Sequence, residues 1–402
     1  MPLGWIDFSQ KDRNLILSVL ESLTEKKAVD ELGVASIRDG FANLFFPGTS
    51  TLQTRAKYFL IVPYALKDLE EFIKANKNLS SQKVFLKLHD IEKSCCIKFL
   101  ENNKDENGVL GKLALSQYGW LKRTPADIYI GGLNKFKILE NISLREYINE
   151  LIYNEKLKVK NNISEVGKYE GDSRYERDDE DTILNSNLFK LDIKTYDKNW
   201  KGNLKIELTK EEGKFLKNKI ITSVNDSLFA KILEKNILLN DFDNFESLKK
   251  VIREFPQQIQ DDYKLAYEFS DFWFVVQNLY NDIVLDGKNL EIKDFLNNNI
   301  FEFKVIAEKI DIEKIFERLN LITKGSLYFF LMDVQNYMRK GDFKSIKDRI
   351  KAREIAIKGE KRAKVNHIGE YEYDKLFSGS KLGYRFINAK NIIQDIFYSE
   401  NL

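Results

Sequence analysis

Residues that break helices are scarce in this chain, and this scarcity limits its fold more than any other feature. The 402 residues include only 20 glycines and five prolines, whereas Lys, Glu, Leu and Ile are abundant. A β-sandwich or barrel needs a turn about every 8–12 residues, and turns favour Gly and Pro. We therefore expect a mainly α, multi-helix protein of two or three domains, with a few short strands near the middle.

Hydropathy argues against a membrane protein. The longest apolar runs, residues 59–66 and 327–334, are far shorter than the roughly 18 residues that a spanning helix needs. The chain starts Met-Pro-Leu-Gly-Trp, without a basic region followed by an apolar one, so we expect no secretory leader. The expected location is the cytoplasm.

Composition also excludes several chemistries. The only cysteines, Cys95 and Cys96, are adjacent, so they have no second pair with which to form a zinc site or a disulfide framework. With His89 and His367 as the only histidines, a three-histidine metal site is impossible. We expect reduced, helix-buried thiols and neither a metal nor a cofactor.

The distribution of acidic residues suggests a domain boundary. Residues 165–181 contain eight acids, three basic residues and almost no apolar side chain, which is typical of a linker or long loop. The segment lacks the regular spacing of a calcium-binding loop. We expect an N-terminal helical domain over 1–160, an acidic linker or loop over 161–188, and a C-terminal helical domain over 189–402. Short strands are expected at 189–193 and 204–208.

Several helix starts carry capping signals, in which a Ser or Thr precedes a Glu or Gln by three residues. These pairs are Ser50 with Gln53, Ser143 with Glu146, and Thr209 with Glu212. Thr124, Pro125 and Asp127 form a further start, with Pro at the first helical position. Short helices joined by tight turns are compatible with a helix-turn-helix or winged-helix arrangement in the N-terminal part, and equally with a generic helical bundle.

The strongest local charge signal lies in residues 344–364, where nine Lys or Arg residues accompany three acids. Such a segment can bind a phosphate backbone through charge and bidentate arginine contacts. The alternative is a solvated helical face followed by a loop. The candidate nucleic-acid-binding residues are Arg349, Lys351, Arg353, Lys358, Lys361, Arg362 and Lys364. Tyr371 and Tyr373 follow and are candidates for stacking on bases.

A second candidate is the turn from Pro47 to Arg55, which we expect at a helix N-terminus with free backbone N–H groups. Hydroxyls and a guanidinium beside such groups make an anion site. Its residues are Thr49, Ser50, Thr51, Gln53 and Arg55. The turn lacks the second Gly and the Lys-Ser/Thr pair of a Walker motif, so nucleotide hydrolysis is not supported. A purely structural helix start is the alternative.

Catalytic residues are not identifiable from the sequence. Asp192, Lys194 and Glu207 flank the expected strands and resemble the carboxylate-lysine core of a metal-dependent nuclease. Their spacing is loose, and a chain with 62 acidic residues produces accidental matches.

Blocks of residues resemble a known family. They are Gly4 to Ser9, Ile37 to Phe41, and above all Phe46 to Phe59 followed by Val62-Pro63, with looser matches at 122–129, 208–212, 279–281, 358–362 and 383–386. The chain is thereby similar to a bacterial family catalogued as domain of unknown function 6361. The family supplies no activity or catalytic residues. The resemblance implies a bacterial cytoplasmic protein, with some members encoded among antiphage defence genes.

These observations predict a non-catalytic component of a bacterial antiphage defence system that binds nucleic acid, expected to be DNA, or other subunits of that system. Two alternatives stay open. One is a metal-dependent enzyme that acts on nucleic acid, and the other is a protein scaffold.

Overall fold

The described part of the chain is helical. The computed structural model describes residues 30–76, 79–116, 119–140, 142–166, 191–202, 204–371, 376 and 380–401, and no strand occurs among them. Their one isolated bridge joins Leu139 and Leu191 in antiparallel fashion. The mainly α class is therefore confirmed. The opening block at residues 4–9 and most of the expected acidic linker lie outside the described residues.

The expected strand at 204–208 is absent, although its burial alternates as a strand's would. Leu204, Ile206 and Leu208 are buried, while Lys205 is exposed. The backbone carbonyl of Leu204 accepts its hydrogen bond from a side chain and not from a neighbouring strand: Asn102 Nδ2 donates to it at 2.9 Å. Residues 191–193 of the other expected strand contribute only the single bridge.

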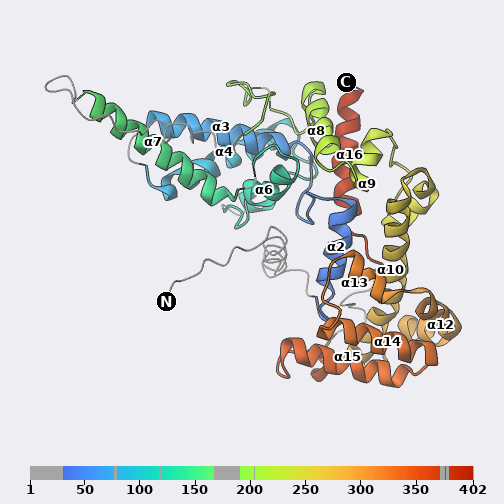
Figure 1. Ribbon diagram of the computed structural model, residues 1–402. Coiled ribbons are helices and arrows are strands. Elements are labelled where there is room, and N and C mark those ends of the chain that lie inside the picture. Colours follow the sequence, from blue (N-terminus) through green and yellow to red (C-terminus); the bar gives the residue numbers. More distant parts are fainter. Residues whose placement is uncertain are drawn as a thin grey trace, which may run out of the picture. The chain divides into compact units, whose positions relative to one another are not determined.

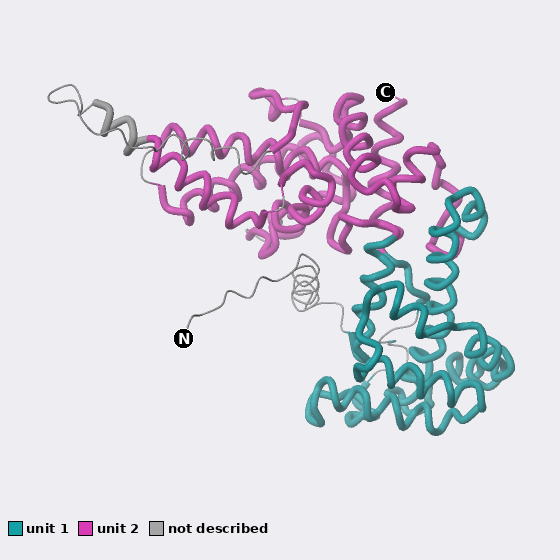
Figure 2. Tube along the Cα trace, in the orientation of Figure 1, with its two compact units in different colours: residues 1–44, 248–384 teal, residues 45–247, 385–402 magenta. Residues whose placement is uncertain are grey.

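Two compact units make up the chain, and both are discontinuous in sequence (Figure 2). Unit 1 comprises residues up to Leu44 together with Leu248–Tyr384. Unit 2 comprises Phe45–Ser247 and Arg385–Leu402. Each unit is therefore assembled from separate parts of the sequence, unlike the consecutive domains expected at 1–160 and 189–402.

Unit 2 is built on α3, which packs against α4, α6 and α7 (Figure 1). A second group of contacts joins α8 to α9 and to α16. The helices are α3 (Tyr58–Ala75), α4 (Ser81–Asn102), α5 (Lys112–Ser116), α6 (Pro125–Lys135), α7 (Leu144–Val166), α8 (Lys210–Ser223), α9 (Leu228–Glu234) and α16 (Phe386–Glu400). The 3-10 helix η3 (Phe245–Lys250) crosses the boundary between the units.

The capping signals at α6, α7 and α8 predicted the starts of these three helices correctly. Thr124 and Asp127 form a capping box at α6, with Pro125 at the first helical position. Thr209 and Glu212 form another at α8. Ser143 and Glu146 exchange the same pair of hydrogen bonds at the start of α7.

The helix expected to start at Ser50 is wrong, because α3 begins only at Tyr58. Gln53 does accept a hydrogen bond from the Ser50 amide, at 3.2 Å, as in a capping box. Its amide nitrogen, however, donates to the carbonyls of Gly48 and Ile128, so the side chain stabilises a turn and not a helix end.

Unit 1 surrounds the long helix α10 (Gln257–Val284), whose Phe269, Trp273, Val276 and Tyr280 are buried. The aromatic stripe of this helix is thus core. The other helices are α2 (Ala35–Phe45), α11 (Leu290–Asn298), α12 (Ile300–Lys309), α13 (Ile312–Arg318), α14 (Ser326–Lys340) and α15 (Phe343–Lys358), with the 3-10 helices η4 (Ile252–Glu254) and η5 (Lys364–Asn366). Helices α14 and α15 lie side by side (Figure 1).

None of the helices in the described ranges is long and apolar enough to cross a membrane.

Candidate functional site

The basic segment spans α15 and the loop after it. Some of its cations contact other residues of unit 1, and others are exposed to solvent. Arg349 Nε donates to Asp333 of α14 at 2.8 Å, in an ion pair whose members are both about 40% exposed. Arg353 is held more firmly, since its Nε donates to the Leu32 carbonyl and its guanidinium lies over the Phe330 ring. Burial lowers the pKa of Arg353. Arg353 is therefore engaged in contacts within unit 1.

Glu354 is the centre of a buried cluster of hydrogen bonds at the end of α15. Its side chain is 0% exposed, and four donors converge on its carboxylate. Oε1 accepts from the Tyr280 hydroxyl at 3.0 Å, Lys358 Nζ at 2.8 Å and the Lys364 amide at 3.1 Å, and Oε2 accepts from the Val365 amide at 3.1 Å. Burial of Tyr280, next to the Glu354 charge, raises the pKa of that hydroxyl, so it acts as a neutral donor.

A second buried acid, Glu31, balances the lysines of this cluster. Glu31 is 6% exposed and forms ion pairs with Lys358 and Lys364. Burial is the largest influence on the pKa of Lys358 and lowers it to about 8; the nearby Lys364 and Arg362 charges lower it as well, and Asp30 opposes them. A buried cation requires carboxylate partners, which here are Glu31 and Glu354. Lys358 and Lys364 are therefore internal ion-pair residues.

The loop of residues 359–367, here called the α15 loop, is tightly hydrogen-bonded. Gly359 ends the helix with a φ of 79°, a left-handed conformation that favours glycine. Arg362 Nε donates to the Lys358 carbonyl at 2.9 Å, and a His367 ring nitrogen lies 3.1 Å from the Lys361 carbonyl oxygen. The loop thus has a defined backbone, from which the side chains of Lys361 and Arg362 are exposed to solvent.

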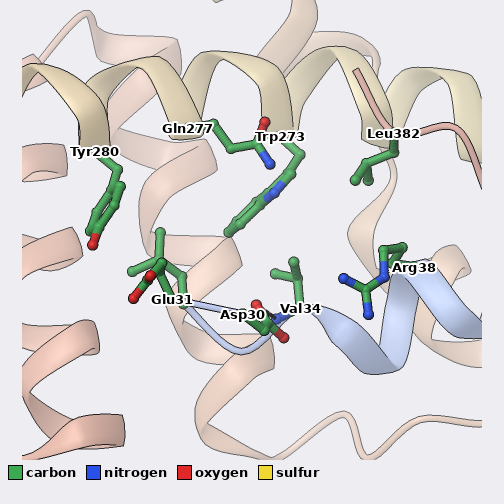
Figure 3. A pocket seen from close by; sticks show the side chains of 9 residues that line it. Asp30, Glu31, Val34, Arg38, Trp273, Gln277, Tyr280 and Leu382 are labelled. Atoms are coloured by element: carbon green, nitrogen blue, oxygen red, sulfur yellow. Dashed lines mark hydrogen bonds between the residues drawn. The ribbon is translucent and has the colours of Figure 1, made fainter. Parts of the chain in front are cut away.

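A cavity of about 140 Å³ adjoins the buried cluster (Figure 3). Helix α10 contributes Trp273, Gln277 and Tyr280 to one wall, and the segment before α2 contributes Asp30 and Glu31. The two carboxylates already have partners: Asp30 accepts the backbone N–H groups at the start of α2, and Glu31 pairs with lysines. The cavity walls are therefore held by internal contacts.

The groups of the second candidate, the turn from Pro47 to Arg55, are largely engaged within unit 2. Thr49 Oγ1 donates to the Phe46 carbonyl at 2.6 Å, and the carbonyl of Thr51 accepts from Asn388 Nδ2 at 3.3 Å. Ser50 and Gln53 bond to each other as described above. No helix N-terminus exists here to supply free N–H groups, since α3 starts three residues after Arg55.

Arg55 is an internal crosslink. Its Nε lies 3.0 Å from Asp395 of α16, and its Nη1 donates to Glu106 at 2.7 Å. The pKa of Arg55 is raised: burial opposes the shift, and Asp395 and Glu106 outweigh it. The Arg55 amide also donates a hydrogen bond to the Tyr129 hydroxyl oxygen, at 3.2 Å. These contacts match the structural alternative for this turn.

A protein-family model matches the N-terminal part of the chain. Residues 1–158 match the model of a family of unknown function, DUF6361. The resemblance seen in the opening blocks is thereby confirmed, whereas the looser blocks from residue 208 onward lie outside the match. No curated protein and no solved structure matches the chain.

Helix α6, within the DUF6361 match, does not present a recognition surface. Ala126, Ile128, Tyr129 and Leu133 are buried. Its exposed positions hold Asp127, Gly131 and Lys135. They therefore present one acidic side chain and one basic side chain, and the glycine presents none. A recognition helix instead exposes several polar side chains toward base edges. The described ranges also contain no β-hairpin that would form a wing.

Other candidate chemistry is not assembled. Burial raises the pKa of Cys95 to about 12 and that of Cys96 to about 11, which leaves both as inert thiols. Asp192 pairs with Lys219 at 2.7 Å. Across the described ranges, no group of three or more His, Cys, Asp or Glu side chains is placed to hold a metal ion.

Sequence reasoning missed Glu354 and Glu31, the acids that decide which cations are internal. For Glu354 a signal exists: Ile346 and Ile350 are buried at a spacing of four residues, and Glu354 occupies the next position of the same stripe. An acid in an apolar stripe indicates a buried carboxylate with several donors. No comparable pattern marks Glu31, whose partners lie more than 300 residues away.

Proposed function

We propose that this protein binds nucleic acid without catalysing a reaction, as a cytoplasmic protein whose contacts with phosphates come from the end of α15 and the α15 loop. The observation that carries the proposal is a loop with a fixed backbone that exposes Lys361 and Arg362. Phosphate contacts position a protein on nucleic acid and do not require base recognition. DNA is the proposed polymer.

Arg362 suits this role because its Nε is anchored while the residue stays exposed. A guanidinium oriented in this way offers its terminal nitrogens to a phosphate at a lower entropic cost than a flexible side chain. Lys351, on α15, is partly exposed and adds a further positive charge. With a net charge of only +2 for the whole chain, attraction to a polyanion has to arise locally.

The two alternatives receive less support. Asp192 of the suggested nuclease core is paired with a lysine. The apolar faces of α10 and α14 that a scaffold would use are packed inside unit 1, as the burial of Phe269, Leu331 and Val334 illustrates. A role in antiphage defence rests on the sequence resemblance and stays a prediction.

The test is a charge-reversed variant that leaves the internal ion pairs intact, Lys351→Glu/Lys361→Glu/Arg362→Glu. Binding to fluorescent single- and double-stranded DNA and RNA is measured at about 50 and 200 mM salt, with Mg²⁺ present and product lengths checked. We expect the wild type to bind without cleaving, and the variant to bind at least tenfold more weakly. Its salt dependence should be lower by about 0.9 in log–log slope for each lost phosphate contact.

The matched control is Lys205→Glu/Lys210→Glu/Lys214→Glu, which changes the net charge equally at three exposed lysines of unit 2. We expect this control to bind nearly as tightly as the wild type. Equal losses in both variants would show that only overall charge matters. Shortened product would favour the enzyme, and no binding at low salt would favour the scaffold.

A further inference from the structure

The proposed phosphate contacts depend on a loop, and the structure shows what holds that loop. Lys364 and Val365 follow Arg362 in sequence, and their amides both donate to the Glu354 carboxylate, at 3.1 Å each. The same carboxylate accepts from Lys358, whose carbonyl anchors Arg362. One buried side chain thus contacts the end of α15 and the far side of the α15 loop.

Burying the Glu354 carboxylate has a free-energy cost, which suggests that the carboxylate has a specific role. A fully buried carboxylate loses its hydration, and several charge-assisted hydrogen bonds are needed to offset that loss. An apolar residue would continue the stripe of Ile346 and Ile350 without this cost. The carboxylate gives the loop what an apolar side chain cannot: directional bonds to two consecutive backbone amides.

We propose that Glu354 is the positioning residue of the nucleic-acid site: its carboxylate holds the α15 loop in the conformation that presents Lys361 and Arg362 to phosphate. This inference rests on the proposed function. The negative charge of Glu354 repels phosphate. The inference nevertheless makes Glu354 necessary for phosphate binding, because it holds the loop in place.

The inference is testable because the charge of Glu354 and its positioning role predict opposite changes in DNA affinity when the residue is replaced. Glu354→Gln removes one negative charge and weakens the bonds to the loop amides. Asp348→Asn removes one negative charge at an exposed position of the same helix. If electrostatic attraction alone governed binding, both variants would bind DNA more tightly than the wild type. If Glu354 positions the loop, Asp348→Asn binds as tightly as the wild type or tighter, and Glu354→Gln binds roughly threefold to tenfold more weakly, with a salt slope lower by about one.

Glu354→Asp provides a variant with unchanged net charge. Its carboxylate is one methylene shorter and is withdrawn from the Lys364 and Val365 amides, so we expect weaker binding here as well. Folding of each variant is checked by far-ultraviolet circular dichroism. If Glu354→Gln does not fold, Glu354→Asp decides.

Amide hydrogen exchange separates this inference from the proposed function. We expect exchange at Lys364 and Val365 to be at least tenfold faster in Glu354→Gln than in the wild type, without nucleic acid present. Faster exchange together with weaker binding supports the proposal. Binding by Glu354→Gln that equals or exceeds that of Asp348→Asn overturns it, and so does unchanged exchange. If the wild type binds no nucleic acid, the proposed function fails, and faster exchange would then show a loop clamp without that role.

Discussion

Two buried carboxylates, Glu354 and Glu92, accept different numbers of hydrogen bonds. The environment of Glu92 predicts how the stability of the protein depends on pH. Glu354 accepts from two amides, a lysine and a tyrosine. Glu92, on α4, is 3% exposed and accepts from the Ala126 amide in the first turn of α6, at 2.8 Å. Burial raises the pKa of Glu92 to about 8, and hydrogen bonding from the Ala126 amide and the Thr124 side chain opposes this only in part.

The Glu92 shift predicts a loss of stability as the pH rises. In the unfolded chain this carboxyl releases its proton near its ordinary pKa of 4.5, whereas in the folded protein it keeps the proton up to about pH 8. Between these values the folded state binds more protons, so the free energy of unfolding falls as pH increases. Glu92→Gln, which carries no titratable proton, should remove this contribution.

Urea unfolding at pH 5, 6.5 and 8 measures the effect. We expect the wild type to lose more stability than Glu92→Gln between pH 5 and 8. Glu146→Gln is the control, because Glu146 is exposed and its pKa is lowered by the hydroxyl and amide of Ser143. Parallel pH profiles for the wild type and Glu92→Gln would contradict the assignment.

At the scale of elements, the capping box of α6 makes a local prediction. Thr124 accepts from the Asp127 amide, and Asp127 accepts from the Thr124 amide. Thr124→Ala removes the side-chain acceptor and should lower the free energy of unfolding by about 1 kcal/mol. Thr124→Ser keeps the hydroxyl and should lose less than half of that amount. Equal losses in the two variants, measured by urea unfolding, would show that the methyl group and not the cap matters.

Caps of this kind were predictable because both partners lie within one turn of the chain. The signal at Ser50 and Gln53 failed for a tertiary reason: Gln53 also bonds to the Ile128 carbonyl on α6, and α3 starts only at Tyr58. The basic segment was similarly visible as a run of charges. Its division into internal and exposed cations was not visible, since Glu31 approaches Lys364 from more than 300 residues away.

At the scale of the whole molecule, the division into units was not predictable from composition. The acidic stretch at 165–181 suggests a boundary, yet unit 2 combines residues on both sides of it with the C-terminal helix α16. Nothing in the local sequence of α16 specifies that its partner is α8, which is separated from it by all of residues 248–384.

The contribution of α16 to unit 2 can be tested by deleting residues 385–402. The deletion removes Phe386, Ile392, Ile393, Ile396 and Phe397, which are all buried, and the Asp395 partner of Arg55. At about 1.5–3 kcal/mol for each buried apolar side chain, the loss is on the order of 10 kcal/mol. That equals the whole stability of an ordinary domain. We therefore expect unit 2 to lose its cooperative thermal transition, whereas deletion of residues 401–402 alone leaves the melting temperature unchanged. A shortened chain that melts as the full chain does would show that α16 is dispensable and that the remaining helices of unit 2 form a complete core.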